Sequence, residues 1–90
     1  KKMIFRLKAA QAACGTSVGA ASTFGASEFV RLINSGTTVR LVTVANAADT
    51  TLGTISLAGS ETIVLKKNQT DQIFAAHAEI LGAGVIIENA

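Results

Sequence analysis

TLGTISLAGSETIVLKK, residues 51–67, is the stretch that decides the fold. Apolar or glycine positions alternate with Thr and Ser along TLGTISL, and ETIVLKK alternates in a similar way. A period of two indicates β-strands in which one face is buried. Gly59 lies in the short turn between the two segments, where a glycine takes a positive φ without steric cost. The stretch therefore predicts a β-hairpin over residues 51–67.

The segment on the N-terminal side of this stretch repeats the pattern of short strands and turns. EFVRLIN, residues 28–34, is followed by Ser35 and Gly36, and TTVRLVTVAN, residues 37–46, begins at once. Both segments are rich in β-branched residues, which favour strands. We predict a second hairpin over residues 28–46.

The last third of the chain allows two interpretations. Ile73, His77, Ile80 and Leu81 follow a helical spacing, with Gly82 placed to end a helix. DQIFAA and EILGAGVIIEN are also typical of strands, with the glycines at a bulge or a tight bend. We favour strands, because the preceding segments already commit the chain to a sheet.

The N-terminal part differs from the rest. Met3, Phe5 and Leu7 alternate with other residues as in a strand, but nearly every position of residues 9–27 is Ala, Gly, Ser or Thr. Such residues bury little area and cannot by themselves offset the entropy of ordering. We predict an all-β fold, a small antiparallel β-sandwich or partial barrel over residues 28–90, preceded by an extended N-terminal arm with a short strand over residues 1–27.

The composition favours a subunit of an assembly. Hydrophobic residues make up 49% of the 90 residues and charged residues 16%, against roughly 25% charged in an ordinary soluble domain. A domain this small leaves much of its chain exposed, so apolar patches and hence interfaces are expected. The net charge is only +2 and Trp and Tyr are absent, so nucleic acid is not an expected partner. No segment has the roughly 20 apolar residues that span a bilayer, so no membrane partner is expected either.

The residues that carry chemistry are few and scattered. Cys14 is the only cysteine and His77 the only histidine, so neither a nucleophile with an oriented base nor a closed zinc site is expected. The glycines of CGTSVGAASTFGAS, residues 14–27, lack the spacing of a phosphate-binding loop. We therefore predict a protein that is not an enzyme, with no catalytic residues, no metal and no cofactor.

Three segments carry a resemblance to a known class of proteins: RLKAAQAACGT, FVRLINSG and, above all, GTISLAGSETIVLKKNQTDQIFAA. They resemble the small structural proteins of tailed-bacteriophage virions, particularly those of marine phages that infect cyanobacteria. The resemblance implies a β-sandwich that sits on a capsid or tail as a cement or decoration subunit. It also implies a location in the virion, with major capsid or tail proteins or further copies of the chain as partners.

A small-residue stretch that carries a strand-forming end is what an arm crossing to another subunit requires, because small side chains let backbones approach. We expect Met3, Phe5, Leu7 and Phe24 to be the interface residues. Phe24 has a second interpretation, as an aromatic plug of the chain's own core. Deletion of residues 1–27 is expected to leave a folded body that no longer assembles.

Two other functions are compatible with the sequence. One is a subunit of a self-assembling extracellular or surface filament, in which the arm enters the next copy of the same chain. The other is a small carbohydrate-binding module, although the absence of Trp and Tyr removes the aromatic faces on which sugars usually stack.

Overall fold

A computed structural model describes residues 3–89 as a predominantly β fold with two antiparallel sheets, and these residues contain no α-helix. Its elements are β1 (Met3–Leu7), β2 (Ala12–Ala13), the 3₁₀ helix η1 (Val18–Ala20), β3 (Phe29–Asn34), β4 (Arg40–Ala45), β5 (Thr51–Leu57), β6 (Thr62–Lys66), β7 (Gln72–Ala75) and β8 (Ile80–Asn89). Lys1, Lys2 and Ala90 lie outside the described residues. The expectation of an all-β chain with antiparallel sheets is confirmed.

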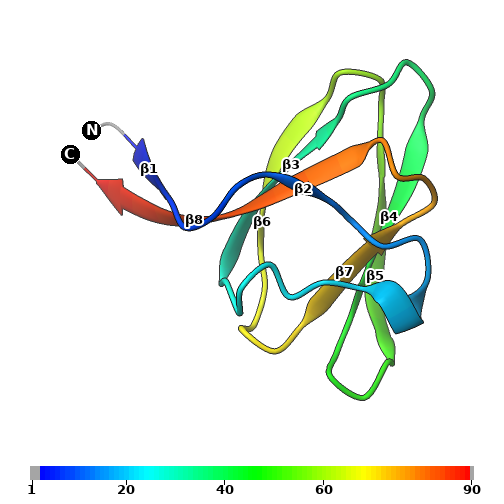
Figure 1. The fold of residues 1–90 in the computed structure, drawn as a ribbon, viewed down its shortest axis with the longest axis horizontal. Coiled ribbons are helices and arrows are strands. Elements are labelled where there is room, and N and C mark those ends of the chain that lie inside the picture. Colours follow the sequence, from blue (N-terminus) through cyan, green and yellow to red (C-terminus); the bar gives the residue numbers. More distant parts are fainter. Residues whose placement is uncertain (1–2, 90) are drawn as a thin grey trace.

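The longest strand, β8, organises the first sheet (Figure 1). The strand order is β1-β8-β3-β6, and β2 also pairs with β8. One edge of β8 pairs with β3 from Ile80 to Val85, and the other edge pairs with β2 and then with β1. The second sheet has the order β5-β4-β7. The preference for strands over a helix in the last third is therefore confirmed by β7 and β8.

Both predicted hairpins are wrong. β3 and β6 pair with each other in the first sheet, whereas β4 and β5 pair in the second, so each tight turn carries the chain from one sheet to the other. The hairpin in the structure is β4–β5, where the Asn46 N–H donates to the Thr50 carbonyl at 2.9 Å. Alternation of side chains shows which face of a strand is buried, but it does not show which strand pairs with its edges.

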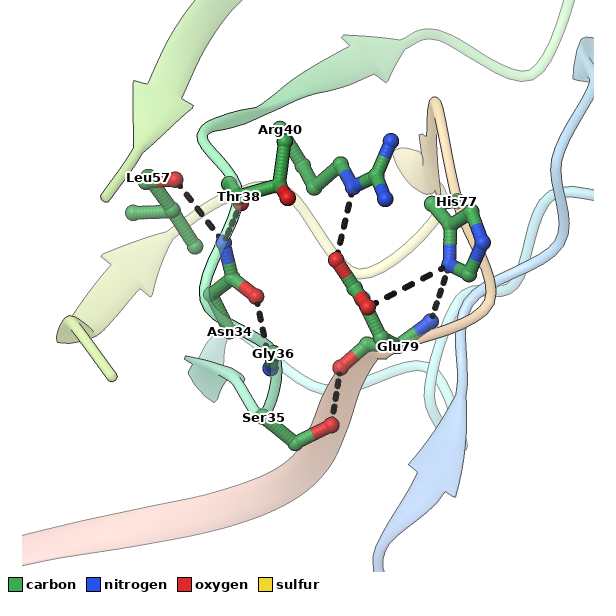
Figure 2. Close-up of polar contacts among 8 residues, drawn as sticks. All are labelled: Asn34, Ser35, Gly36, Thr38, Arg40, Leu57, His77 and Glu79. Atoms are coloured by element: carbon green, nitrogen blue, oxygen red, sulfur yellow. Dashed lines mark hydrogen bonds and ion pairs between the residues drawn. The ribbon is translucent and has the colours of Figure 1, made fainter. Parts of the chain in front are cut away.

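The two crossing turns, residues 35–39 and 58–61, meet at Asn34 (Figure 2). The side chain is fully buried. Its amide nitrogen donates to the carbonyls of Thr38 at 2.7 Å and Leu57 at 3.0 Å, and its oxygen accepts the Gly36 N–H at 3.0 Å. One side chain thereby satisfies backbone groups of both crossings, which would otherwise lose their hydrogen bonds on burial.

Gly59 is needed in the second crossing for a reason other than the predicted positive φ. The left-handed conformation falls on the next residue, Ser60, whose φ is 65°. A Cβ atom on Gly59 would instead lie 2.7 Å from the Cα of Thr37 in the first crossing. The glycine therefore allows the two turns to pack backbone against backbone.

Strands of both sheets contribute to one hydrophobic core. The largest fully buried side chains come from both of them: Leu32, Leu57, Ile73 and Ile80. They form one cluster with further buried residues, among them Cys14.

The bulge or tight bend predicted at Gly82 and Gly84 of β8 does not occur, because the β3–β8 register is continuous. A Cβ atom on Gly82 would meet the ring of Phe24, which covers this glycine.

The extended arm predicted over residues 1–27 is not confirmed. β2 pairs with β8, and Cys14 is 3% exposed within the core cluster. Ser22 and Ile73 exchange both of their backbone hydrogen bonds, at 3.0 and 2.8 Å. The small side chains of this segment let its backbone lie close to the sheets, so a composition that buries little area is nevertheless part of the packed chain.

Candidate protein–protein interface

The two ends of the described chain form a strand pair that we call the terminal ribbon: β1 together with residues 85–89 of β8. The antiparallel register runs from Leu7 opposite Val85 to Met3 opposite Asn89. Because β3 begins at Phe29, which pairs with Val85, the rest of β8 extends beyond β3. Figure 1 shows the ribbon, dark blue and red, projecting from the main part of the fold.

Four of the nine exposed large apolar side chains of the described residues lie on this short ribbon, and the other five are spread over the β3–β4 turn, β4, β5 and β6. Ile4 is 46% exposed, Phe5 41%, Leu7 71% and Ile86 42%. Two-stranded ribbons are marginally stable in water, and a contiguous exposed apolar patch on a protein usually marks an interface. The ribbon is therefore the candidate functional site among the described residues.

The register divides the ribbon into two faces. Phe5 lies opposite Ile87 on one face, and Arg6 lies opposite Ile86 on the other. Arg6 also forms an ion pair with Glu88, with Nη2 2.7 Å from Oε1. Both charged residues of the ion pair lie on the face of Ile86, where their charges compensate each other. The face with Phe5 and Ile87 therefore remains apolar.

The ribbon also has a free backbone edge on β1. The Lys8 N–H donates to the Gly84 carbonyl at 3.1 Å. In an antiparallel pair, alternate residues direct both backbone groups at the partner strand, so Arg6 and Ile4 face β8 like Lys8. The N–H and C=O of Phe5 consequently point away from β8, in the direction from which another strand would approach.

An open groove lies at the base of the ribbon, with a volume of about 260 Å³. Its lining combines apolar groups of Phe29, Ile86 and Ile87 with the charged residues Lys8 and Glu28. It lies where β3 begins at Phe29 and β8 continues past it, and it therefore enlarges the surface that the ribbon offers to a partner.

The structure places the predicted interface residues in two different regions. Phe5 and Leu7 lie on the same face of the ribbon, whereas the side chain of Met3 lies outside the described part. Phe24 packs against the chain's own core over Gly82, which agrees with the interpretation as a core plug. Its φ of 52° is in the left-handed region that favours glycine, a strained conformation supported by the hydrogen bond of its N–H to Ser22 Oγ at 3.0 Å.

Ile4, Ile86 and Ile87 are interface candidates that the sequence did not single out. Their place in the ribbon depends on pairing between the first and last strands, which local patterns do not predict. One signal was present: Arg6 and Glu88 are opposite charges near the two ends, and each lies among apolar residues.

The candidate chemical groups are engaged in packing or ion pairing. Burial raises the pKa of the Cys14 thiol to about 11, although a backbone hydrogen bond acts in the opposite direction, so little nucleophilic thiolate forms at neutral pH. Within residues 3–89, no group of three or more His, Cys, Asp or Glu side chains is arranged to hold a metal ion. The same residues include no helix long and apolar enough to cross a membrane.

The polar cluster around Glu79 ties the β7–β8 connection to β4 (Figure 2). Arg40 Nε donates to Glu79 Oε2 at 2.6 Å, and the Ser35 hydroxyl donates to the Glu79 carbonyl at 2.6 Å. The hydrogen bond from Arg40, followed by the charges of Arg40 and His77, lowers the pKa of the Glu79 carboxyl against the opposing effect of desolvation. These contacts hold together two segments distant in sequence, which is a structural role.

The ribbon is thus an apolar, strand-edge surface of a kind that binds other proteins. Comparisons of the chain with protein-family models, with curated proteins and with solved structures find no match.

Proposed function

We propose that the chain is a non-enzymatic structural protein of a tailed-phage virion, a capsid decoration or cement subunit that holds a neighbouring subunit through its terminal ribbon. The observation that carries the proposal is the exposure of Ile4, Phe5, Leu7 and Ile86 on one projecting strand pair. The assignment to a virion is supported by the segment resemblance described above.

The rest of the chain suits a rigid support for this ribbon. Core residues of both sheets belong to one cluster, which supports a small antiparallel β-sandwich. Within the arm predicted over residues 1–27, residues 9–27 pack along this body, so we assign the clamp to the ribbon that β1 forms with β8. No cofactor is needed, and the partners are major capsid or tail proteins, further copies of the chain, or both.

Two features of the ribbon make the clamp physically reasonable. The free edge of β1 supplies main-chain hydrogen bonds, and the apolar face with Phe5 and Ile87 supplies area that a partner can remove from water. Such a contact is small, but many copies on a lattice add their affinities through avidity. A decoration subunit therefore needs only a weak individual contact.

The proposal is tested on tailed-phage particles purified from marine cyanobacterial hosts. Antibodies against the chain should label heads or tails in immunogold microscopy, and its tryptic peptides should co-purify with the particles. Particles from a phage that encodes the chain but carry neither label nor peptides would contradict the assignment to the virion.

Binding through the ribbon is tested with the same particles after the chain has been stripped from them. The double variant Leu7→Ser, Ile86→Ser should rebind at least about tenfold more weakly than the wild type, because a loss of 1.4 kcal/mol corresponds to tenfold in affinity. Val39→Ser is the matched control, since Val39 is 60% exposed and lies outside the ribbon. Equal rebinding of the double variant and the wild type would show that the ribbon is not the clamp.

A further inference from the structure

The strand β5 is a sheet edge that is unprotected from Gly53 to Leu57; the one register shift in its pairing with β4 lies between Thr51 and Gly53. It forms one end of the second sheet, in the order β5-β4-β7. Its seven residues, Thr51–Leu57, include no charged residue, and all but the last are exposed. Proteins usually protect edge strands with charges, prolines or bulges, because an unprotected edge pairs with another strand.

An apolar cleft lies beside this edge. We call it the β5–β6 cleft; its volume is about 190 Å³, and it is lined by Val42, Val44, Gly53, Thr54, Ile55 and Leu65. Ile55 is opposite Val42 in the register and so shares its inner face, yet it is 43% exposed. The inner face of β5 therefore remains partly uncovered along this cleft.

The cleft has room for a large apolar side chain. An apolar cavity of about 150 Å³ accommodates a benzene molecule. A Cβ atom added to Gly53 would meet nothing within 4 Å, so the centre of β5 leaves this space open. A strand added beside β5 would direct every second side chain into the cleft.

The terminal ribbon of the same molecule cannot occupy the cleft. β1 and β6 are at opposite ends of the first sheet, and β1 is held on β8 along all five of its residues. Among the phenylalanines that the structure describes, Phe5 is the only exposed one. An occupant supplied by this chain must therefore come from a second copy.

If the occupant is the strand β1 of a second copy, the distribution of charges favours pairing with β5 over pairing with β6. Arg6 of β1 is compensated by Glu88 at 2.7 Å, and β5 is uncharged, so the two edges approach without like charges opposite each other. Of the other edges, β7 is bridged by Gly15 and Ser22, and β6 ends in Lys66 and is followed by Lys67. Pairing there would bring Arg6 and Lys8 towards further positive charges.

We propose that β1 of one copy adds to the free edge of β5 of the next copy, with Phe5 and Leu7 of the added strand in the β5–β6 cleft. This inference rests on the proposed function and names the partner of the ribbon as a second copy of the chain. The donor and acceptor surfaces differ, so the contact is head-to-tail and generates open chains of subunits. One five-residue strand buries far less than the about 800 Å² per partner of a stable interface, so association is weak except at high concentration or on a lattice.

The test measures mass by light scattering during size exclusion over a range of concentrations. The wild-type mass should rise above the 9.2 kDa of one chain and pass beyond the dimer. Phe5→Ser removes the donor side chain, and Gly53→Val fills the acceptor cleft. Each variant alone should need at least about tenfold higher concentration than the wild type to reach the same mean mass.

Mixing the variants gives the sharpest outcome. Phe5→Ser retains the cleft and Gly53→Val retains the donor strand, so an equimolar mixture should form dimers and stop there. Gly19→Val is the matched control, because a Cβ on Gly19 also meets nothing within 4 Å, and it should assemble like the wild type. Leu7→Ser, at a residue that is 71% exposed, repeats the donor test, and circular dichroism verifies that every variant is folded.

Three results would overturn the inference: a wild type that stays monomeric at every concentration, donor and cleft variants that assemble like the wild type, or a mixture that forms no dimers. These outcomes are separate from the virion test. Label on virions with a monomeric purified chain would retain the proposed function and reject self-association. Long chains of purified protein without any label on virions would support self-association and reject the virion assignment. That result would favour the alternative function as a subunit of a self-assembling filament.

Discussion

At the scale of single residues, the buried amide of Asn34 determines how the two crossing turns are held. Its three hydrogen bonds go to backbone groups of Thr38, Leu57 and Gly36. Nothing in the sequence pattern distinguishes Asn34 from an ordinary turn residue, because its role depends on two turns that are distant along the chain.

Asn34→Ala should lower the free energy of unfolding by about 2 to 4 kcal/mol, because it leaves the buried Leu57 carbonyl and the partly buried groups of Thr38 and Gly36 without this partner. Urea denaturation measures the loss. The control is Asn46→Ala: the Asn46 side chain accepts the N–H groups of Ala48 and Thr50 in an exposed turn, so its loss should cost about 1 kcal/mol or less. Equal effects of the two substitutions would contradict the role assigned to Asn34.

Cys14 should make stability depend on alkaline pH. Its pKa is about 11 in the folded chain against an ordinary 9.0, so the folded state holds the proton more tightly than the unfolded state. The stabilisation is complete below pH 9 and is lost as the pH rises towards 11, by a total of about 2 to 3 kcal/mol. Denaturation with urea between pH 8 and pH 11 measures this loss.

The control for this pH dependence is Cys14→Ala. Burial lowers the pKa of Lys67, which contributes with the opposite sign, since stability then rises with pH up to the ordinary value of 10.5. The variant retains Lys67 and lacks the thiol, so the difference between wild type and variant isolates Cys14. A difference that stays constant with pH would show that the thiol does not titrate abnormally.

At the scale of elements, alternation and β-branched residues predicted where most strands lie, whereas the crossings between the sheets determined which strands pair with each other. β3 to β4 and β5 to β6 both cross at the same end of the molecule. The two turns can pack together only because Gly59 lies against the Thr37 backbone.

Gly59→Ala should therefore lower the free energy of unfolding by about 1 to 3 kcal/mol, because a Cβ would be 2.7 Å from the Thr37 Cα and the backbone must shift. The melting temperature measures the effect. Gly19→Ala is the control at an unobstructed position, where we expect a change within about 0.5 kcal/mol. If Gly59→Ala is equally mild, the crossings do not depend on this contact.

At the scale of the whole molecule, β8 joins the body to the ribbon, and the small-residue segment belongs to the body. Cys14 and Phe24 contribute to the core cluster, and Ser27 is 1% exposed. Residues 1–27 were expected to be dispensable for folding, but residues 9–27 contribute to the body. We now expect that only residues 1–7 can be deleted without loss of the fold.

Deletion of residues 1–7 should leave a cooperative unfolding transition, because the side chains of β1 from Ile4 to Leu7 are exposed. Deletion of residues 1–27 should abolish the transition: loss of core groups costs several kcal/mol, comparable to the about 5 to 10 kcal/mol that stabilises a domain of this size. Thermal unfolding followed by circular dichroism distinguishes the two deletions. A cooperative transition in the longer deletion would instead support the prediction that residues 1–27 form an arm separate from the folded body.

By itself, the sequence determined the strand-rich class of the fold and the alternating segments that became β5 and β6, because side-chain periodicity is a local property. The β-branched residues of β3 and β4 also favoured strands, whereas the segments of β7 and β8 fitted a helix as well. The sequence also indicated that Phe5 and Leu7 belong to an apolar N-terminal strand. The tertiary structure alone decided the sheet partners, the burial of Cys14 and Asn34, and the pairing of β1 with β8. These features depend on contacts between residues far apart in the chain, and no local pattern of side chains specifies them.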